Sequence, residues 1–186
     1  MSVRILALVG SLRAGSHNRQ LAEAAMKHAP EGVEITLYEG LAEVPFYNED
    51  IDVEGTVPEA AARLRATAAA TDAFLLFSPE YNGTIPAVLK NAIDWLSRPH
   101  GAGALSGKPV AVVGTAYGQY GGVWAQDEAR KAAGIAGAAV LTDVKLSIPG
   151  SVIRFAETHP ADDTEVVEGL TRVIDQLTRA GAAAAA

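Results

Sequence analysis

Residues 10–18 place glycines and polar side chains directly after an apolar run at 3–9. Hydroxyl, guanidinium and amide groups bind phosphate well, and the start of a helix adds free backbone N–H groups and a favourable dipole. The side chains that could hold a phosphate here are Ser11, Arg13, Ser16 and Asn18. We therefore predict a phosphate-binding turn at this position.

This turn lacks the groups that bind a nucleoside triphosphate or a dinucleotide. A Walker A loop needs Lys and then Ser or Thr after its second glycine, whereas Ser16 and His17 stand there. The dinucleotide fingerprint G-x-G-x-x-G fails because Leu12 replaces its second glycine. A terminal monophosphate fits best. The alternative is that Ser16 only caps a helix and Arg13 is solvated.

Two more turns rich in glycine or proline follow apolar runs, at 78–84 and 114–122. The turn at 78–84 offers accessible backbone groups beside an aromatic ring and an amide, which suit the edge of a flat heteroaromatic ring. In an open α/β sheet, ligands bind outside the carboxyl ends of the strands, so all three turns can meet in one crevice. A monophosphate and a flat ring together point to a bound flavin. Each turn taken alone could be an ordinary chain reversal.

Strands and helices alternate along the chain. Apolar runs predict strands at 3–9, 33–38, 73–77, 109–115 and within 138–146. Capping residues, breakers and helical spacing predict helices at about 16–28, 56–71, 85–96, 122–135 and 163–179, with an irregular connection at 41–55. This alternation indicates the α/β class with a doubly wound parallel sheet. The pattern does not reveal the order of the strands.

Length and composition indicate one compact domain. With 186 residues, of which 49% are hydrophobic, the chain can bury a sizeable core, and we expect a single domain over residues 1–180. Residues 181–186 are one glycine followed by five alanines, and we expect them to form a frayed tail.

Charge and residue types exclude several functions. The net charge is -7 and no run of Lys or Arg occurs, which argues against a nucleic-acid partner. The lack of cysteine excludes thiolate metal sites and thiol redox chemistry, and the scattered histidines predict no metal site. Electron chemistry must therefore come from a bound cofactor. The apolar stretches are too short to span a membrane, so we expect a cytoplasmic protein.

The chain resembles the NAD(P)H-dependent FMN reductases of the flavodoxin-like fold, a family that includes bacterial chromate and quinone reductases. The resemblance rests on the turn at 10–18, on 79–86 continuing into 89–96, and on Gly118-x-x-Gly121-Gly122 followed by Gln126 and Arg130. It covers nearly the whole chain except the tail. It implies a five-stranded parallel sheet of order 2-1-3-4-5, with FMN held noncovalently at the tips of strands 1, 3 and 4. It also implies a homodimer, or a tetramer, in which each flavin lies near the partner chain.

The resemblance assigns one part of FMN to each turn. The phosphate would be held by Ser11, Arg13, Ser16 and Asn18. The isoalloxazine ring would be lined by Pro79, Glu80, Tyr81, Asn82, Gly83 and Thr84. The pyrimidine end of the ring would be closed by Thr115, Tyr117, Gly118, Gly121 and Gly122.

The chemistry of such a site belongs to the flavin, so we predict no catalytic acid or base among the side chains. NADH or NADPH would deliver a hydride to the flavin N5, and backbone N–H groups of 118–122 could stabilise the charge that develops near N1 and O2. A flavin, a quinone or a similar small acceptor would then use the same face, which predicts ping-pong kinetics. The alternative is a non-enzymatic electron carrier like flavodoxin, although its phosphate loop is normally rich in Thr and lacks an equivalent of Arg13.

Two residues depart from the pattern of the chromate reductases. Some of those proteins carry an aromatic residue where Gly83 stands, and an Arg where Trp124 stands. The first change opens the site and leaves the substrate preference undetermined. The second puts the tetramer contacts of that branch in doubt.

Four other side chains invite an interpretation. We expect Glu80 to orient its turn rather than to act as an acid or base. Trp95 lies off the apolar stripe of its helix, so we favour a dimer contact for it over packing within the fold. Tyr117 and Tyr120 could form a surface that supports the nicotinamide or could simply pack within the protein, and the sequence favours neither role.

Overall fold

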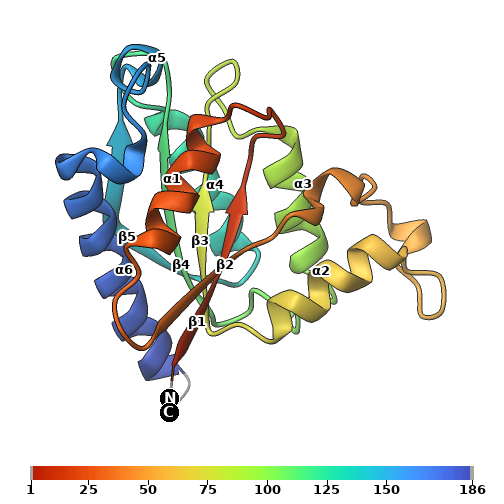
Figure 1. The fold of residues 1–186 in the computed structure, drawn as a ribbon. Coiled ribbons are helices and arrows are strands. Elements are labelled where there is room, and N and C mark those ends of the chain that lie inside the picture. The colour runs from red at the N-terminus through yellow and green to blue at the C-terminus, as the bar shows by residue number, and fades with distance from the viewer. Residues whose placement is uncertain (1, 185–186) are drawn as a thin grey trace.

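The computed structural model describes residues 2–184 and contains one five-stranded sheet (Figure 1). All neighbouring strands run parallel, in the order β2-β1-β3-β4-β5. The strands are β1 (Val3–Val9), β2 (Val33–Leu37), β3 (Ala73–Phe77), β4 (Pro109–Thr115) and β5 (Ala139–Ile148). The predicted doubly wound α/β class and the strand order implied by the resemblance are both confirmed.

Helices cover both faces of the sheet (Figure 1). One face packs against α1 (His17–Lys27) and α6 (Thr164–Ala184), and the other against α2 (Glu59–Ala69), α3 (Ala87–Leu96) and α4 (Val123–Ile135). Shorter helical pieces lie in the connections: η1 (Gly40–Glu43), η2 (Glu49–Ile51), α5 (Ser151–Arg154) and η3 (Pro160–Asp162). Because the strands are parallel, each one ends at the same edge of the sheet. The turns that follow the strands are therefore brought together.

Alternate residues of β1 supply two hydrophobic cores. Ile5 and Ala7 belong to the core under α1 and α6, whereas Leu6 and Leu8 belong to the core under α2, α3 and α4. Every residue of β3 and β4 is buried. Strands that are covered on both faces read as continuous apolar runs, which is why the sequence identified them.

The C-terminal segment differs from its prediction. Helix α6 continues to Ala184 rather than ending near residue 179. Gly181 is buried in it, and a Cβ atom there would lie 3.1 Å from Val3 Cγ1. The expectation of a frayed tail is therefore wrong for residues 181–184, because the helix continues through them and Gly181 packs against the start of β1. Residues 185 and 186 of the expected tail lie outside the described residues.

Trp95 is buried, so its predicted role as a dimer contact is wrong. Its indole N–H donates to the carbonyl oxygen of Pro45 at 2.8 Å, and its ring meets Tyr47 edge-on at 5.1 Å between centroids. The guanidinium of Arg65 lies over the ring, 5.0 Å from its centroid. The side chain lies off the apolar stripe of α3 because the connection between η1 and η2 folds over this side of the helix. Trp95 therefore belongs to a second layer of packing within the chain.

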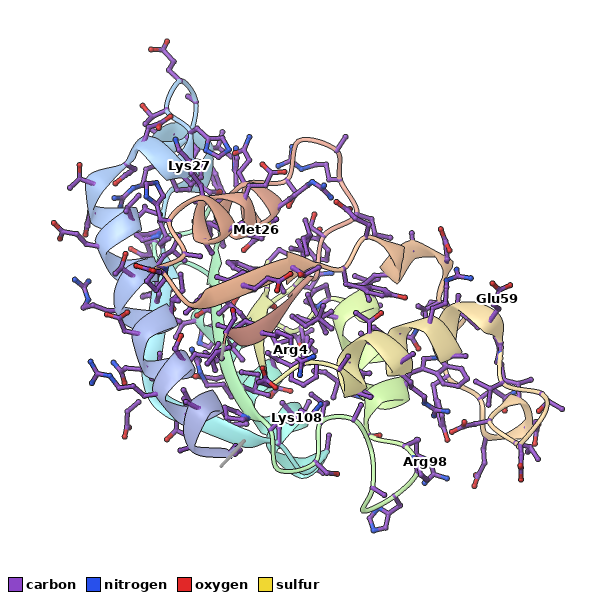
Figure 2. All side chains as sticks on the ribbon, turned by 60° about the horizontal axis from the view of Figure 1, so that its bottom comes forward. Arg4, Met26, Lys27, Glu59, Arg98 and Lys108 are labelled. Atoms are coloured by element: carbon purple, nitrogen blue, oxygen red, sulfur yellow. The ribbon has the colours of Figure 1, made fainter. Side chains whose placement is uncertain are left out.

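The amino edge of the sheet is closed by paired polar groups, and Figure 2 shows Arg4 and Lys108 close together there. The Arg4 side chain binds Asp72 at 3.1 Å between Nη2 and Oδ1. Lys108 Nζ donates to two carbonyl oxygens where α2 ends, Ala68 at 2.7 Å and Ala69 at 3.0 Å. Arg4 thus pairs with Asp72, and Lys108 binds the C-terminal end of α2, so these charged groups stabilise the fold.

Candidate functional site

A cleft of about 200 Å³ lies at the carboxyl edge, where the turns after β1, β3 and β4 meet. Backbone hydrogen bonds continue the sheet into these turns, with Gly10 N–H donating to Phe77 O at 2.8 Å and Ser78 N–H to Val113 O at 2.9 Å. The cleft is lined by Ser11, Arg13, Ser16, His17, Asn18, Pro79, Glu80, Tyr81, Thr115, Ala116, Tyr117 and Ser151. The predicted meeting of the three turns is thus present in the structure.

The first turn presents its polar groups to the cleft. Ser16 is the N-cap of α1, and its Oγ accepts from Arg19 N–H at 3.3 Å, as the capping interpretation expected. Because that bond uses only an oxygen lone pair, the Ser16 hydroxyl proton stays free to donate. Arg13 is exposed, and within residues 2–184 no acceptor binds its guanidinium. A cation without a partner beside a helix N-terminus suits an anion.

His17 lies beside Arg13 in the same cleft. Partial burial lowers the pKa of His17 below its ordinary value, and the positive charge of Arg13 lowers this pKa further. Both effects favour the neutral form of the imidazole. An anion bound between the two side chains would oppose both effects and favour the protonated form.

Asn18 joins the first turn to the end of β4. Its Nδ2 donates to the carbonyl oxygen of Thr115 at 2.9 Å, and its Oδ1 accepts from Thr115 N–H at 3.0 Å. The Thr115 hydroxyl donates in turn to Ile148 O at 2.7 Å. Both residues lie in the predicted cleft, but most of their polar atoms bind the backbone. They fix the distance between two turns, and the second amide hydrogen of Asn18 remains free to donate to a ligand.

The second turn is a tight hairpin that projects above the sheet (Figure 1). Tyr81 and Thr84 exchange backbone hydrogen bonds of 3.3 and 3.2 Å, while Asn82 and Gly83 adopt positive φ values of 54° and 76°. Asn-Gly is the sequence that such a turn prefers. The Tyr81 hydroxyl reaches back to Ser11 Oγ at 3.3 Å, so it links the first and second turns.

Glu80 connects the second turn to α4. Its Oε2 accepts from the backbone N–H of Ala125 at 3.1 Å, in the first turn of that helix. Because the N-cap is Gly122, which has no side chain, Glu80 supplies the missing acceptor and places a negative charge at the positive end of the helix. This contact matches the orienting role expected for Glu80.

The third turn is held against β5 by a close approach and a buried amide. Gly121 has a φ of 62°, and a Cβ atom on it would lie 2.7 Å from Ile148 N, so a larger residue would collide with the strand. Gln126 is fully buried. Its Nε2 donates to Gly121 O at 3.0 Å, and its Oε1 accepts from the Ser147 hydroxyl at 2.8 Å. The backbone of this turn is thus rigidly placed.

Not every predicted residue lines the cleft. The predicted residues outside it are Asn82, Gly83, Thr84, Gly118, Gly121 and Gly122. They belong to the hairpin of the second turn and to the third turn, beside the cleft.

The sequence interpretation missed His17, Ala116 and Ser151 as cleft residues. Ser151 begins α5 directly after β5, and its N–H donates to Ala116 O at 3.1 Å. The rule that parallel strands end at one edge applied to β5 as well, so the Pro149-Gly150 signal could have located it.

Neither metal sites nor membrane spans are found in the part of the chain that the structure describes. Residues 2–184 contain no cluster of three His, Asp or Glu side chains that could hold a metal ion. None of the helices described is both long and apolar enough to cross a membrane.

Comparisons with known proteins identify the family of the chain. The profile of the NADPH-dependent FMN reductase family matches residues 3–152. The chain is 36% identical to the 2-hydroxy-1,4-benzoquinone reductase of a Burkholderia species over 172 residues, which cover 92% of this chain and 90% of that protein. It is 43% identical to a quinone reductase of Pseudomonas putida over 127 residues, covering 68% of this chain and 67% of the relative.

A solved structure shares the whole architecture. The chain is similar to FerB, a flavoenzyme NAD(P)H:(acceptor) oxidoreductase from Paracoccus denitrificans, with a TM-score of 0.85 and 30% identity over 97% of this chain and 98% of that one. These matches confirm the predicted enzyme class and its pairing of FMN with NAD(P)H, and they favour an enzyme over an electron carrier. The chain belongs to the NADPH-dependent FMN reductase family.

Proposed function

We propose that this chain is an FMN-dependent reductase that takes a hydride from NADH or NADPH and passes electrons to a small acceptor, a flavin or a quinone. The observation that carries the proposal is the cleft at the carboxyl edge, where three turns meet around the guanidinium of Arg13, which no acceptor binds within residues 2–184. The names of the relatives support the same reaction class.

The residues present fit FMN. A phosphate in the first turn would meet the Arg13 guanidinium, the hydroxyl protons of Ser11 and Ser16, and the N-terminus of α1. The ring would extend past Tyr81 toward the third turn, whose backbone is fixed by Gln126. Bound FMN would supply the centre that accepts and releases the hydride.

A flavin titration tests the cofactor assignment. The apoprotein should bind FMN more tightly than riboflavin, because only FMN carries the phosphate that the first turn would hold. Equal affinities for the two flavins would overturn the role of the first turn. Failure of either flavin to bind would overturn the proposed function itself.

We further propose that the two substrates use the same open face in turn, so that the kinetics are ping-pong. The surface beside the cleft is open at Gly83 and Gly118, where an added Cβ would meet no atom within 4 Å. Initial rates measured against both substrates should therefore give parallel double-reciprocal lines. Intersecting lines would show that both substrates bind together and would contradict this scheme.

We also propose that the chain assembles as a homodimer, or as a tetramer, in the cytoplasm where NAD(P)H is available. A groove of about 510 Å³ runs between α3 and α4, with Ile135 80% exposed at its rim. Charges of both signs border it, including Lys90, Asp94 and Glu128, which allows the same surface on a second copy to complement it. Sedimentation velocity should show an assembly that Ile135→Glu weakens, and a monomer at all concentrations would contradict the proposal.

A further inference from the structure

Two aromatic side chains stand exposed beside the third turn. Tyr120 is 55% exposed and Trp124 is 53% exposed. Their ring centroids lie 5.3 Å apart with the planes tilted by 55°, so the two rings form one apolar surface. The chain has only two tryptophans, and the other, Trp95, is fully buried. Exposed rings in contact with each other call for an explanation in terms of a ligand or a partner.

The backbone holds this pair in a fixed relation to the proposed cofactor site. Tyr120 lies within the turn at 114–122, directly before Gly121, which is packed against β5. Trp124 lies in the first turn of α4, directly before Ala125, whose N–H is bound by Glu80. Glu80 lines the cleft, so the backbone that carries the aromatic pair lies next to the lining of the proposed flavin site.

The charges nearby largely offset one another. Asp127 and Glu128 lie three and four residues beyond Trp124, so they share its side of α4. Asp127 pairs with Arg130 at 2.8 Å and lies 3.6 Å from Lys145 Nζ, whereas Glu128 is exposed. Because cations accompany these carboxylates, no strong local charge favours a charged acceptor, and a neutral ring would lose nothing here.

We propose that Trp124, with Tyr120, forms an aromatic shelf that binds neutral planar electron acceptors of the quinone class, and that Trp124 determines the preference for them. This proposal rests on the proposed function, since the acceptor must reach a bound flavin. The quinone ring would bind by offset or edge-to-face contact, because an indole offers a large, rigid, apolar face. The shelf supplies affinity for the acceptor, while hydride transfer does not depend on it.

A fluorescence titration tests binding without turnover. The FMN-loaded, oxidised protein is titrated with 2-methyl-1,4-naphthoquinone in the absence of NAD(P)H. Saturable quenching of tryptophan emission is expected in the unaltered protein. The quenching should be much weaker in Trp124→Phe, where the buried Trp95 is the only tryptophan left. Quenching of equal amplitude in Trp124→Phe, or none in the unaltered protein, would overturn the shelf.

Kinetics with two acceptors test specificity. Trp124→Ala should raise the KM for the naphthoquinone about five- to tenfold and leave the KM for ferricyanide, which is not a planar ring, unchanged. Trp124→Phe should keep most of the naphthoquinone affinity. Phe46→Ala is the matched control, because Phe46 is an aromatic residue 78% exposed in the segment after η1, and it should change neither KM.

The remaining outcomes are also decisive. An equal loss with both acceptors, or a changed sedimentation coefficient in Trp124→Ala, would mean that Trp124 serves the fold or an assembly, and the shelf proposal would be wrong. If the unaltered protein binds the naphthoquinone saturably but oxidises no NAD(P)H with either acceptor, the proposed function fails while the shelf stands.

Discussion

The first and third turns of the site are built in opposite ways. The turn at 10–18 offers side chains to a ligand, and its guanidinium at Arg13 has no partner among the described residues. The turn at 114–122 offers its backbone, and its shape is fixed by the close approach of Gly121 to β5 and by the buried side chain of Gln126. Removal of the Arg13 side chain should therefore cost ligand affinity alone, whereas changes at Gly121 or Gln126 should cost stability and affinity together.

Gly121→Ala should have the largest effect. The new Cβ would lie 2.7 Å from Ile148 N, and the φ of 62° is unfavourable for alanine. We expect a loss of about 2–4 kcal/mol in the free energy of unfolding, together with greatly weakened FMN binding. Urea unfolding and flavin titration measure the two quantities.

Gly118→Ala is the matched control in the same turn. An added Cβ at Gly118 would meet no atom within 4 Å, and stability should stay within about 0.5 kcal/mol. If Gly121→Ala unfolds at the same urea concentration as the unaltered protein, the third turn is not anchored to β5 in the way described here.

Arg13→Ala should separate binding from stability. Loss of a charge-assisted contact to phosphate should weaken FMN binding by about 1.5–3 kcal/mol. The melting temperature of the apoprotein should not change, because the guanidinium makes no hydrogen bond within the described residues. The FMN affinity of Arg13→Lys should lie between those of the unaltered protein and Arg13→Ala, since Lys keeps the charge but loses the forked geometry. Unchanged FMN affinity in Arg13→Ala would remove Arg13 from the phosphate site.

Gln126→Leu tests whether the hydrogen bonds of the Gln126 side chain hold the third turn in place. The Ser147 hydroxyl loses its acceptor and Gly121 O loses its donor, which should cost about 1–3 kcal/mol of stability and also weaken FMN binding. Ser147→Ala alone should cost less. The double variant should cost less than the sum of the two, because both single changes break the same hydrogen bond. Strictly additive losses would show that Gln126 and Ser147 act independently.

Local signals in the sequence were enough to locate the turns. Ser16 was identified as a cap from its place before a helix, and the Asn82-Gly83 pair is itself a turn signal. The buried strands appeared as continuous apolar runs. Each of these features depends on residues close together in the chain, so the sequence predicts them well.

Features that depend on distant residues were missed or misread. Asn18 and Thr115 are 97 residues apart, and no local pattern in either segment predicts that they bind each other. Trp95 was misread because its surroundings come from Pro45 and Arg65, which belong to other elements. Helical periodicity describes one helix and its nearest layer, and it cannot anticipate a loop that folds over the other side.

His17 provides the smallest expected effect and the finest test of the first turn. The pKa of His17 is held below its ordinary value by burial and then by Arg13, and a bound phosphate would raise this pKa. Binding would thus take up a proton, and FMN affinity should increase about two- to fivefold as the pH falls from 8 to 6.5. In His17→Gln this increase should disappear, because only the titration of the phosphate itself remains, and its protonation at the lower pH removes negative charge that Arg13 would bind. Riboflavin, which has no phosphate, should show no dependence on pH in either protein, and an equal dependence for both flavins would place His17 away from the phosphate.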